Sequence, residues 1–164
     1  MAETVKSLRV TVTIKGTIAG ADGAILQVDE TYDQVFNDGT GSDQMGLAVQ
    51  DLNRPLNATS EDLNLDGLTD FQGAASGLNN LGLMYFRNLD EDTGDGLTIG
   101  GASANQFVNW VGDATDKIKV GPKGIFLLVS PVDKYAITAS TGDLLKVETD
   151  DNSTYRYIIG GDNA

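Results

Sequence analysis

Residues 61–71, EDLNLDGLTDF, have the spacing of a calcium-binding loop. Oxygen-bearing side chains fall at alternate positions, a glycine stands where the turn would be, and a further acid follows: Asp62, Asn64, Asp66, Gly67 and Asp70. An EF-hand loop places its oxygen ligands at positions 1, 3, 5, 7, 9 and 12, with glycine at position 6. Counted from Asp62, the first half of the segment satisfies this pattern.

The second half of the same segment does not. Position 12 falls on Gly73, which has no side chain, so the bidentate glutamate that closes the calcium site is missing. The flanks are polar and Gly-rich rather than helical. Leu63 and Leu65 alternate with the candidate ligands, and this is also typical of an edge strand that ends in an Asp-Gly turn. We therefore assign no metal ligand, and a calcium site at 62–70 stays an alternative.

A second acidic segment, NLDEDTGDG at 88–96, offers Asp90, Asp92 and Asp95 as ligands for a hard cation. Its resemblance to calcium-binding β-roll repeats is slight, because those repeats occur in tandem and this segment occurs once. Acidic turns between strands are common, and we interpret the segment as a solvated hairpin loop.

The composition restricts catalysis severely. The chain has no cysteine and no histidine, which excludes disulfides, thiol chemistry and His-dependent triads. A pair of carboxylates could still hydrolyse a glycosidic bond, but none of the 24 acidic residues stands out as such a pair. The only tryptophan, Trp110, lies near Phe107 and is expected to anchor a core or an interface. We predict no enzyme, no catalytic residue and no cofactor.

The charge is high and uneven. The formal net charge is −13, and residues 21–105 hold 15 acidic residues against two basic ones, Arg54 and Arg87. Such a surface repels phosphate backbones, so we expect no direct contact with nucleic acid. The simpler interpretation of this charge is that it keeps the protein in solution. The alternative is that the less acidic ends of the sequence contact a partner while the acidic middle faces solvent.

No segment predicts transfer into or across a membrane. The first residues, MAETVKSLRV, lack the apolar core of a signal peptide. The longest apolar run, IFLLV at 125–129, is far shorter than the roughly 20 residues of a membrane-spanning helix. We expect a protein that is made in a cytoplasm and does not associate with a membrane.

The elements that must position these residues are strands. Apolar residues recur with period two, as in SLRVTVTI, where Leu8, Val10, Val12 and Ile14 alternate with polar residues. GTIAGADGA is expected to form the following turn. Further extended segments are expected at 24–36, 45–52, 81–89, 97–101, 116–120, 124–130, 134–140, 144–149 and 155–159. The segment 105–111 is expected to be either another extended piece or one helical turn.

These segments predict one all-β domain over 1–164. About nine or ten short strands with frequent turns are typical of an antiparallel sandwich or a jelly-roll-like barrel, here with long acidic loops. A long irregular excursion is expected at about 53–82, and a hairpin is expected between 134–140 and 144–149.

A family likeness lies in the last third of the chain. Residues 120–161 contain GPKGIFLLVSP, then TGDLLKVE, then a closing TYRYIIGG, and FNDGTGSDQMGLAVQDLNRPL at 36–56 is of similar character. These segments resemble small β-rich virion structural proteins of tailed bacteriophages. The resemblance implies a head decoration or cement protein on the outer capsid surface. Its expected partners are the major head protein and copies of itself, as a homotrimer.

Other functions remain open. One is another virion part, such as a tail component. A second is a calcium-assisted or glycan-binding β-sandwich module for attachment to a host or another surface, which would show an exposed aromatic platform or a metal at 62–70. A third is a carboxylate hydrolase, which would need two facing acids in a pocket, at least one of them with a raised pKa.

Overall fold

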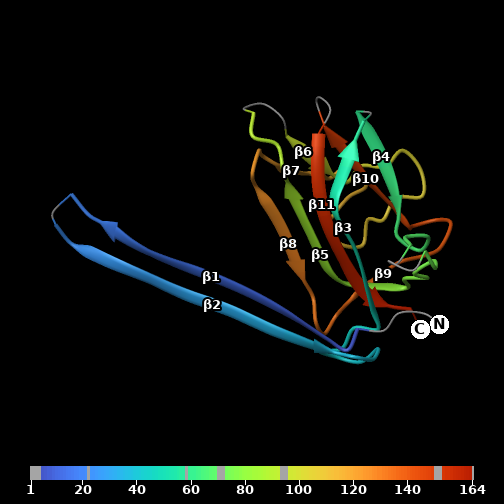
Figure 1. The fold of residues 1–164 in the computed structure, drawn as a ribbon, viewed down its shortest axis with the longest axis horizontal. Coiled ribbons are helices and arrows are strands. Elements are labelled where there is room, and N and C mark those ends of the chain that lie inside the picture. Colours follow the sequence, from blue (N-terminus) through green and yellow to red (C-terminus); the bar gives the residue numbers. More distant parts are fainter. Residues whose placement is uncertain are drawn as a thin grey trace.

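The computed structural model describes residues 5–21, 23–57, 59–69, 73–92, 96–149 and 153–163. Within these ranges it contains eleven strands and no helix. Nine of the strands form two antiparallel sheets packed face to face, and the other two form a long hairpin beside them (Figure 1). The prediction of an all-β fold is confirmed, and of the two architectures considered it is the sandwich that is present.

The larger sheet has the order β3–β11–β5–β8, and the short β9 also pairs with β5. We call it the large sheet. Its strands are β3 (Leu47–Leu56), β5 (Asn80–Asn88), β8 (Ile125–Val129), β9 (Tyr135–Ala136) and β11 (Ser153–Asp162). The small sheet has the order β4–β10–β6–β7. Its strands are β4 (Ser60–Asn64), β6 (Leu97–Ile99), β7 (Ile118–Val120) and β10 (Leu144–Thr149).

The main core fills the space between the two sheets. Alternate residues point inward from each strand, as the period-two pattern requires. The large sheet contributes side chains such as Val49, Phe86 and Ile159, and the small sheet contributes Leu97, Ile99, Leu145 and Val147. On β11, Tyr155 and Tyr157 both point inward, and their rings lie 6.0 and 6.1 Å from that of Phe86.

Two glycines near the end of β11 permit close contacts with neighbouring segments. A Cβ on Gly160 would lie 2.4 Å from the sulfur of Met45, and one on Gly161 would lie 1.8 Å from the carbonyl oxygen of Asn80. The register with β5 shifts between these two glycines, which marks a bulge. The GG of YRYIIGG is thus a packing requirement of the central strand.

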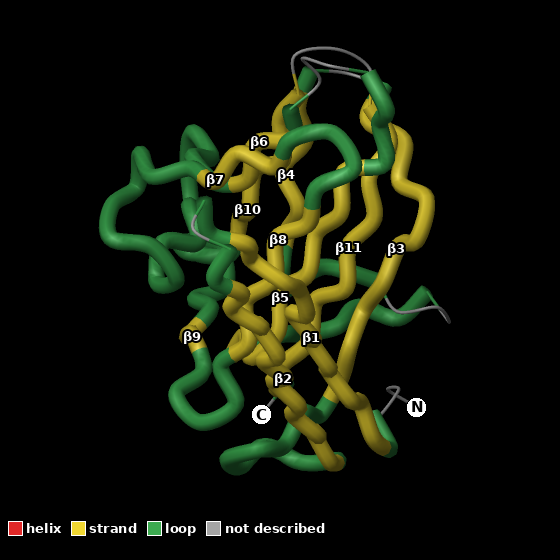
Figure 2. The backbone as a smooth tube through the Cα atoms, turned by 90° about the vertical axis from the view of Figure 1, so that its left-hand side faces the viewer, coloured by secondary structure: helices red, strands yellow, loops and turns green. Residues whose placement is uncertain are grey.

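The remaining strands, β1 (Ser7–Ala19) and β2 (Ile25–Asn37), pair with each other in 13 matched positions and with no other strand. We call this hairpin the arm. It leaves one end of the sandwich and extends far from it (Figure 1). Thirteen residues per strand correspond to a length of about 44 Å. Figure 2, which looks from the side of the arm, shows β1 and β2 in front of the large sheet.

Two details of the predicted secondary structure are wrong, and at a third the alternative to a strand is present. The predicted turn at 16–24 begins later, because Gly16–Ala19 continue β1 and the chain reverses only after Gly20. The hairpin between 134–140 and 144–149 does not form, since β10 pairs with β4 and β6 while β9 pairs with β5. The segment 105–111 contains an isolated bridge and turns in place of a strand.

The predicted excursion at 53–82 is more regular than expected. The end of β3, all of β4 and the start of β5 lie within it, so that the described irregular part covers residues 65–69 and 73–79. Ser76 joins the two irregular segments, because its hydroxyl donates to the carbonyl oxygens of Leu65 and Asp66.

Candidate interaction surfaces

The calcium-like segment is an edge strand and a turn. Asp62 and Asn64 are exposed on β4, whereas Leu63 and Leu65 are buried in the main core. The carboxamide oxygen of Asn64 accepts a hydrogen bond from the backbone N–H of Gly67 at 3.0 Å. Asp70 lies outside the described residues. The alternation that resembled a ligand pattern is therefore the alternation of a strand with one buried face.

The acidic segment 88–96 is anchored to β11 by Asp90. Its carboxylate accepts hydrogen bonds from the hydroxyl of Ser153 and the backbone N–H of Thr154. Asp92 is exposed, and Asp95 lies outside the described residues. In the described part of the chain, no three acidic side chains lie together as a metal site would require.

The acids with displaced pKa values are shifted in the direction opposite to that of a general acid. Among the described residues, the pKa is lowered for Asp33, Glu61, Asp113 and Glu148, and in each case a hydrogen bond contributes to the lowering. A hydrolase of the two-carboxylate type needs one acid whose pKa is raised. These four carboxylates serve as hydrogen-bond acceptors within the fold.

Glu61 is the centre of a network that joins the two sheets. It lies on β4 of the small sheet and accepts hydrogen bonds from Arg54 of β3 at 2.6 and 3.3 Å and from the hydroxyl of Tyr155 at 2.7 Å. Burial raises the pKa of Glu61, but the hydrogen bonds from Arg54 and Tyr155 outweigh it and the net pKa is lowered. Burial, and then the bond to Glu61, raise the pKa of Tyr155. These hydrogen bonds hold the two sheets together.

The exposed aromatic surface is small. Trp110 packs against Phe126 at 5.7 Å between ring centroids, and its indole N–H donates to the carbonyl oxygen of Phe107. Among the described aromatic residues only Tyr32 is exposed, at 40%. This is not the aromatic platform that a glycan-binding module would present.

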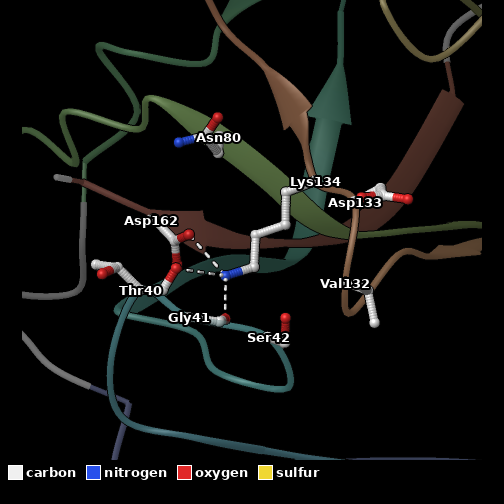
Figure 3. A pocket seen from close by; sticks show the side chains of 8 residues that line it. All are labelled: Thr40, Gly41, Ser42, Asn80, Val132, Asp133, Lys134 and Asp162. Carbon is white, nitrogen blue, oxygen red and sulfur yellow. Dashed lines mark hydrogen bonds and ion pairs between the residues drawn. The ribbon is translucent and has the colours of Figure 1, made fainter.

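A pocket of about 460 Å³ lies at the base of the arm, between the loop that follows β2 and the loop that follows β8. Figure 3 shows Lys134 crossing it. The ammonium group donates to the carboxylate of Asp162 at 2.6 Å and to the carbonyl oxygen of Gly41 at 3.0 Å. The Lys134 and Asp162 side chains are only 6% and 3% exposed. We call this contact the clasp.

The clasp fixes where the arm begins. Three segments that are distant in sequence meet at Lys134: the loop after β2, the loop before β9 and the end of β11. Backbone bonds strengthen the junction, since Asp43 N–H donates to Pro131 and Gly46 N–H donates to Gly161. No sequence signal pairs Lys134 with Asp162.

One face of the arm is polar and internally paired. Residues directly opposite each other in an antiparallel pair point to the same face, and Thr11, Asp33, Lys15 and Asp29 share this one. Arg9 donates two hydrogen bonds to Asp33, at 2.8 and 2.9 Å. The Nζ of Lys15 lies 3.3 Å from the Oδ1 of Asp29, the residue directly opposite it. This face has partners within the arm.

The other face of the arm is apolar and mostly uncovered. It carries the even-numbered apolar positions of β1 and their partners on β2: Leu8, Val10, Val12, Ile14, Ile18, Leu26, Val28, Tyr32 and Phe36. At the base, Phe36 is fully buried with Met45 and Leu83. Farther out, Ile14, Ile18 and Leu26 are 59%, 57% and 61% exposed.

The outer face of the large sheet is continuous with the base of this apolar face. Leu8 and Val10 of the arm pack in the same cluster as Leu127, Val129 and Ile158 of the sheet. Tyr85 lies between Ile158 and Leu127 in register and is half-buried. Ile125 at the far end of β8 is 60% exposed.

Two arginines stand beside this apolar surface. Arg156 and Arg87 are directly opposite each other on β11 and β5. Neither guanidinium has a carboxylate partner among the described residues, and the Nε of Arg156 is buried without a hydrogen-bond acceptor. By contrast, Arg9 and Arg54 both form ion pairs with acids.

The described residues include no helix of the length and hydropathy that spanning a bilayer requires. Comparisons of this chain with protein-family models, with curated proteins and with solved structures find no match. The arm, the clasp and the outer face of the large sheet are therefore interpreted from their own chemistry.

Proposed function

We propose that this protein is a non-enzymatic structural component of a virion: a decoration or cement protein that binds the outer surface of a capsid and associates with copies of itself. The observation that carries the proposal is the arm, a projection of about 44 Å. Beyond the base, its apolar side chains are not covered by any part of the chain that the structure describes. Such a feature is suited to contact between subunits.

The charge and the chemistry of the chain support the same role. A net charge of −13 is tolerated on the outside of a shell, away from the genome, and is unfavourable beside DNA. The shifted carboxylates are engaged in internal hydrogen bonds, as in a protein that works by contact. The resemblance of residues 120–161 to small virion proteins gives the assembly its proposed identity.

The test is binding to head shells that lack this protein. Purified chain and shells are mixed and sedimented together, and the bound fraction is measured against protein concentration. Saturable binding at a fixed number of copies per shell is the expected result. Binding to isolated tails, with none to shells, would reassign the protein to another part of the virion. Absence of binding to both would contradict the proposal.

A further inference from the structure

We propose that the outer half of the arm binds the outer face of the large sheet of a second copy of this chain. The donor is the apolar face around Ile14, Ile18 and Leu26. The acceptor is the surface formed by Tyr85, Ile158, Leu127 and Ile125 with the two arginines Arg87 and Arg156. This inference identifies the self-contact that the proposed function requires.

The apolar face of the outer arm needs another layer of protein packed on it. A two-stranded hairpin is marginally stable in water unless a third strand or another layer packs on it. In the arm, the inner apolar positions have that layer, because Leu8, Val10 and Phe36 pack on the sandwich. The outer positions keep the same alternation, yet Ile18 and Leu26, which are directly opposite each other, are more than half exposed. The sequence continues the pattern of a buried face where none of the described residues covers it.

The acceptor is the part of the sheet's outer face that lies beyond the base of its own arm, which touches it only at the near edge, around Leu127 and Ile158. The base of the arm covers the row of Ala48, Leu83 and Val129. The next row holds Ile158, Tyr85 and Leu127, and the row beyond it holds Arg156, Arg87 and Ile125. These two rows are half-buried or exposed.

Beyond its base, the chain's own arm does not cover these rows, because it is directed away from the sandwich (Figure 1). An occupant must therefore come from another molecule. The chain itself offers one, since the arm presents an apolar strand face and the acceptor is the face of a sheet.

Charge favours a second copy as the occupant. Two arginines directly opposite each other on a sheet repel, and an added carboxylate relieves that repulsion. The apolar face of the arm carries one charged residue, Glu30, directly opposite Ile14. Placing the row of Ile14 and Glu30 on the row of Ile125, Arg87 and Arg156 pairs the apolar side chains with each other and brings the carboxylate to the arginines.

The area points to a ring of copies. The outer half of the arm, eight residue pairs, presents a face about 27 Å long and about 10 Å wide. Covering it removes on the order of 600 Å² from solvent, counting both partners, which is below the roughly 1,200 Å² of a stable interface. In a closed ring each copy donates one arm and receives another, so that every copy takes part in two such contacts, each of on the order of 600 Å². The expected homotrimer is such a ring.

Cross-linking tests the contact directly, because the chain has no cysteine to interfere. One preparation carries Ile14→Cys and another carries Ile125→Cys, and the two are mixed and treated with a short bis-maleimide. A cross-linked heterodimer is expected. The matched control is Thr13→Cys mixed with Ile125→Cys, since Thr13 is the adjacent residue on the polar face. Equal yields from Ile14→Cys and Thr13→Cys would overturn the proposal.

Sedimentation velocity of the full chain gives the independent reading. The unmodified protein is expected to sediment as an oligomer at micromolar concentration. I18K/L26K is expected to sediment as a monomer, while T17K/Q27K, which adds the same charge to the same end of the arm on its polar face, stays oligomeric. Circular dichroism melts check that both variants remain folded. A monomeric unmodified protein, or an oligomer that I18K/L26K does not dissociate, would overturn the proposal.

A double-mutant cycle tests the proposed ion pairing between Glu30 of one copy and Arg87 of another. E30R and R87E are each expected to weaken self-association, and the combination E30R/R87E is expected to restore part of it. None of these measurements uses shells. Failure of the arm contact is therefore seen as a monomer in solution, whereas failure of the proposed virion role is seen as an oligomer that does not bind shells.

Discussion

At the scale of single residues, the chain places its buried charges at junctions between segments. Lys134 and Asp162 join the base of the arm to the end of the large sheet, and Glu61 joins the two sheets through Arg54. In both places the ionised groups have hydrogen-bonding partners, as buried charge requires. Lys134 and Asp162 hold the base of the arm on the large sheet, and Glu61 and Arg54 hold the two sheets together.

Substitution of Lys134 is expected to be costly. K134M leaves the carboxylate of Asp162 buried without its cation, so the free energy of unfolding should fall by about 3–5 kcal/mol. Urea denaturation measures the change. The control is K123M, because Lys123 and its partner Glu91 are 61% and 78% exposed, and its expected cost is about 0–1 kcal/mol. The double variant K134M/D162N should regain part of the loss, and equal effects of K134M and K123M would contradict the clasp.

Acid is expected to weaken the link through Glu61. Its pKa is lower in the folded protein than the ordinary value of 4.5, so its contribution to stability is present above the unfolded-state pKa and is lost as the pH falls through the folded-state pKa. Urea midpoints measured from pH 7 to pH 3 should therefore fall less steeply in E61Q than in the unmodified protein. Parallel curves for E61Q and the unmodified chain would refute this role.

At the scale of elements, β11 is the strand on which the large sheet depends. It lies between β3 and β5, carries the paired tyrosines of the core and ends at Asp162 of the clasp. Its two adjacent glycines admit Met45 and the backbone of Asn80 at distances that no side chain would allow.

A methyl group at Gly161 is expected to disrupt this strand. In G161A the new Cβ meets a backbone oxygen, which cannot rotate away as a flexible side chain could. Overpacking of this kind costs about 1–3 kcal/mol, and more where the backbone must move. Thermal and urea melts measure the loss. G121A is the control, because nothing lies within 4 Å of a Cβ there, and a loss as large in G121A would show that the contact is unimportant.

Most strands could be predicted from the sequence because their alternation reflects one buried face. The segments 81–89, 124–130, 144–149 and 155–159 all correspond to observed strands. Pairing could not be predicted in the same way. The residues 134–140 and 144–149 are near neighbours in sequence, yet β10 finds its partners in β4 and β6, because burial between the sheets outweighs proximity along the chain.

The interaction surfaces were harder to predict than the strands. Alternation in SLRVTVTI is the same whether the apolar face packs on a sheet or extends into solvent, so the sequence did not predict an arm. The clasp joins residues 28 positions apart, without any local motif. The calcium-like spacing at 62–70 coincided with a strand, and a strand pattern and a ligand pattern share the period of two.

At the scale of the whole molecule, the arm and the sandwich have separate roles. The main core of the sandwich includes no arm residue among those described, and the base of the arm packs in a second cluster on the outer face of the large sheet. The outer half of the arm is accordingly expected to be dispensable for folding and required for assembly.

Shortening the arm tests this separation. Replacing residues 13–31 by Asn-Gly joins Val12 to Tyr32, which are already directly opposite each other, through a turn that suits a two-residue hairpin. The melting temperature should change little, while self-association and binding to shells are lost. Circular dichroism and sedimentation measure the two properties. A large loss of melting temperature would mean that the outer arm is part of the folding unit.

The position of β11 also sets the timing of assembly. This strand follows all the others in the sequence, yet β3 has no other neighbour in the large sheet, and the residue that secures the root of the arm is at its end. Until β11 inserts, an unfinished molecule lacks the proposed acceptor face of the large sheet, and the direction of its own arm is not fixed. Under the proposed arm contact, we therefore expect subunits to join only after each has finished folding, because the strand that completes the monomer also completes the surfaces of that contact.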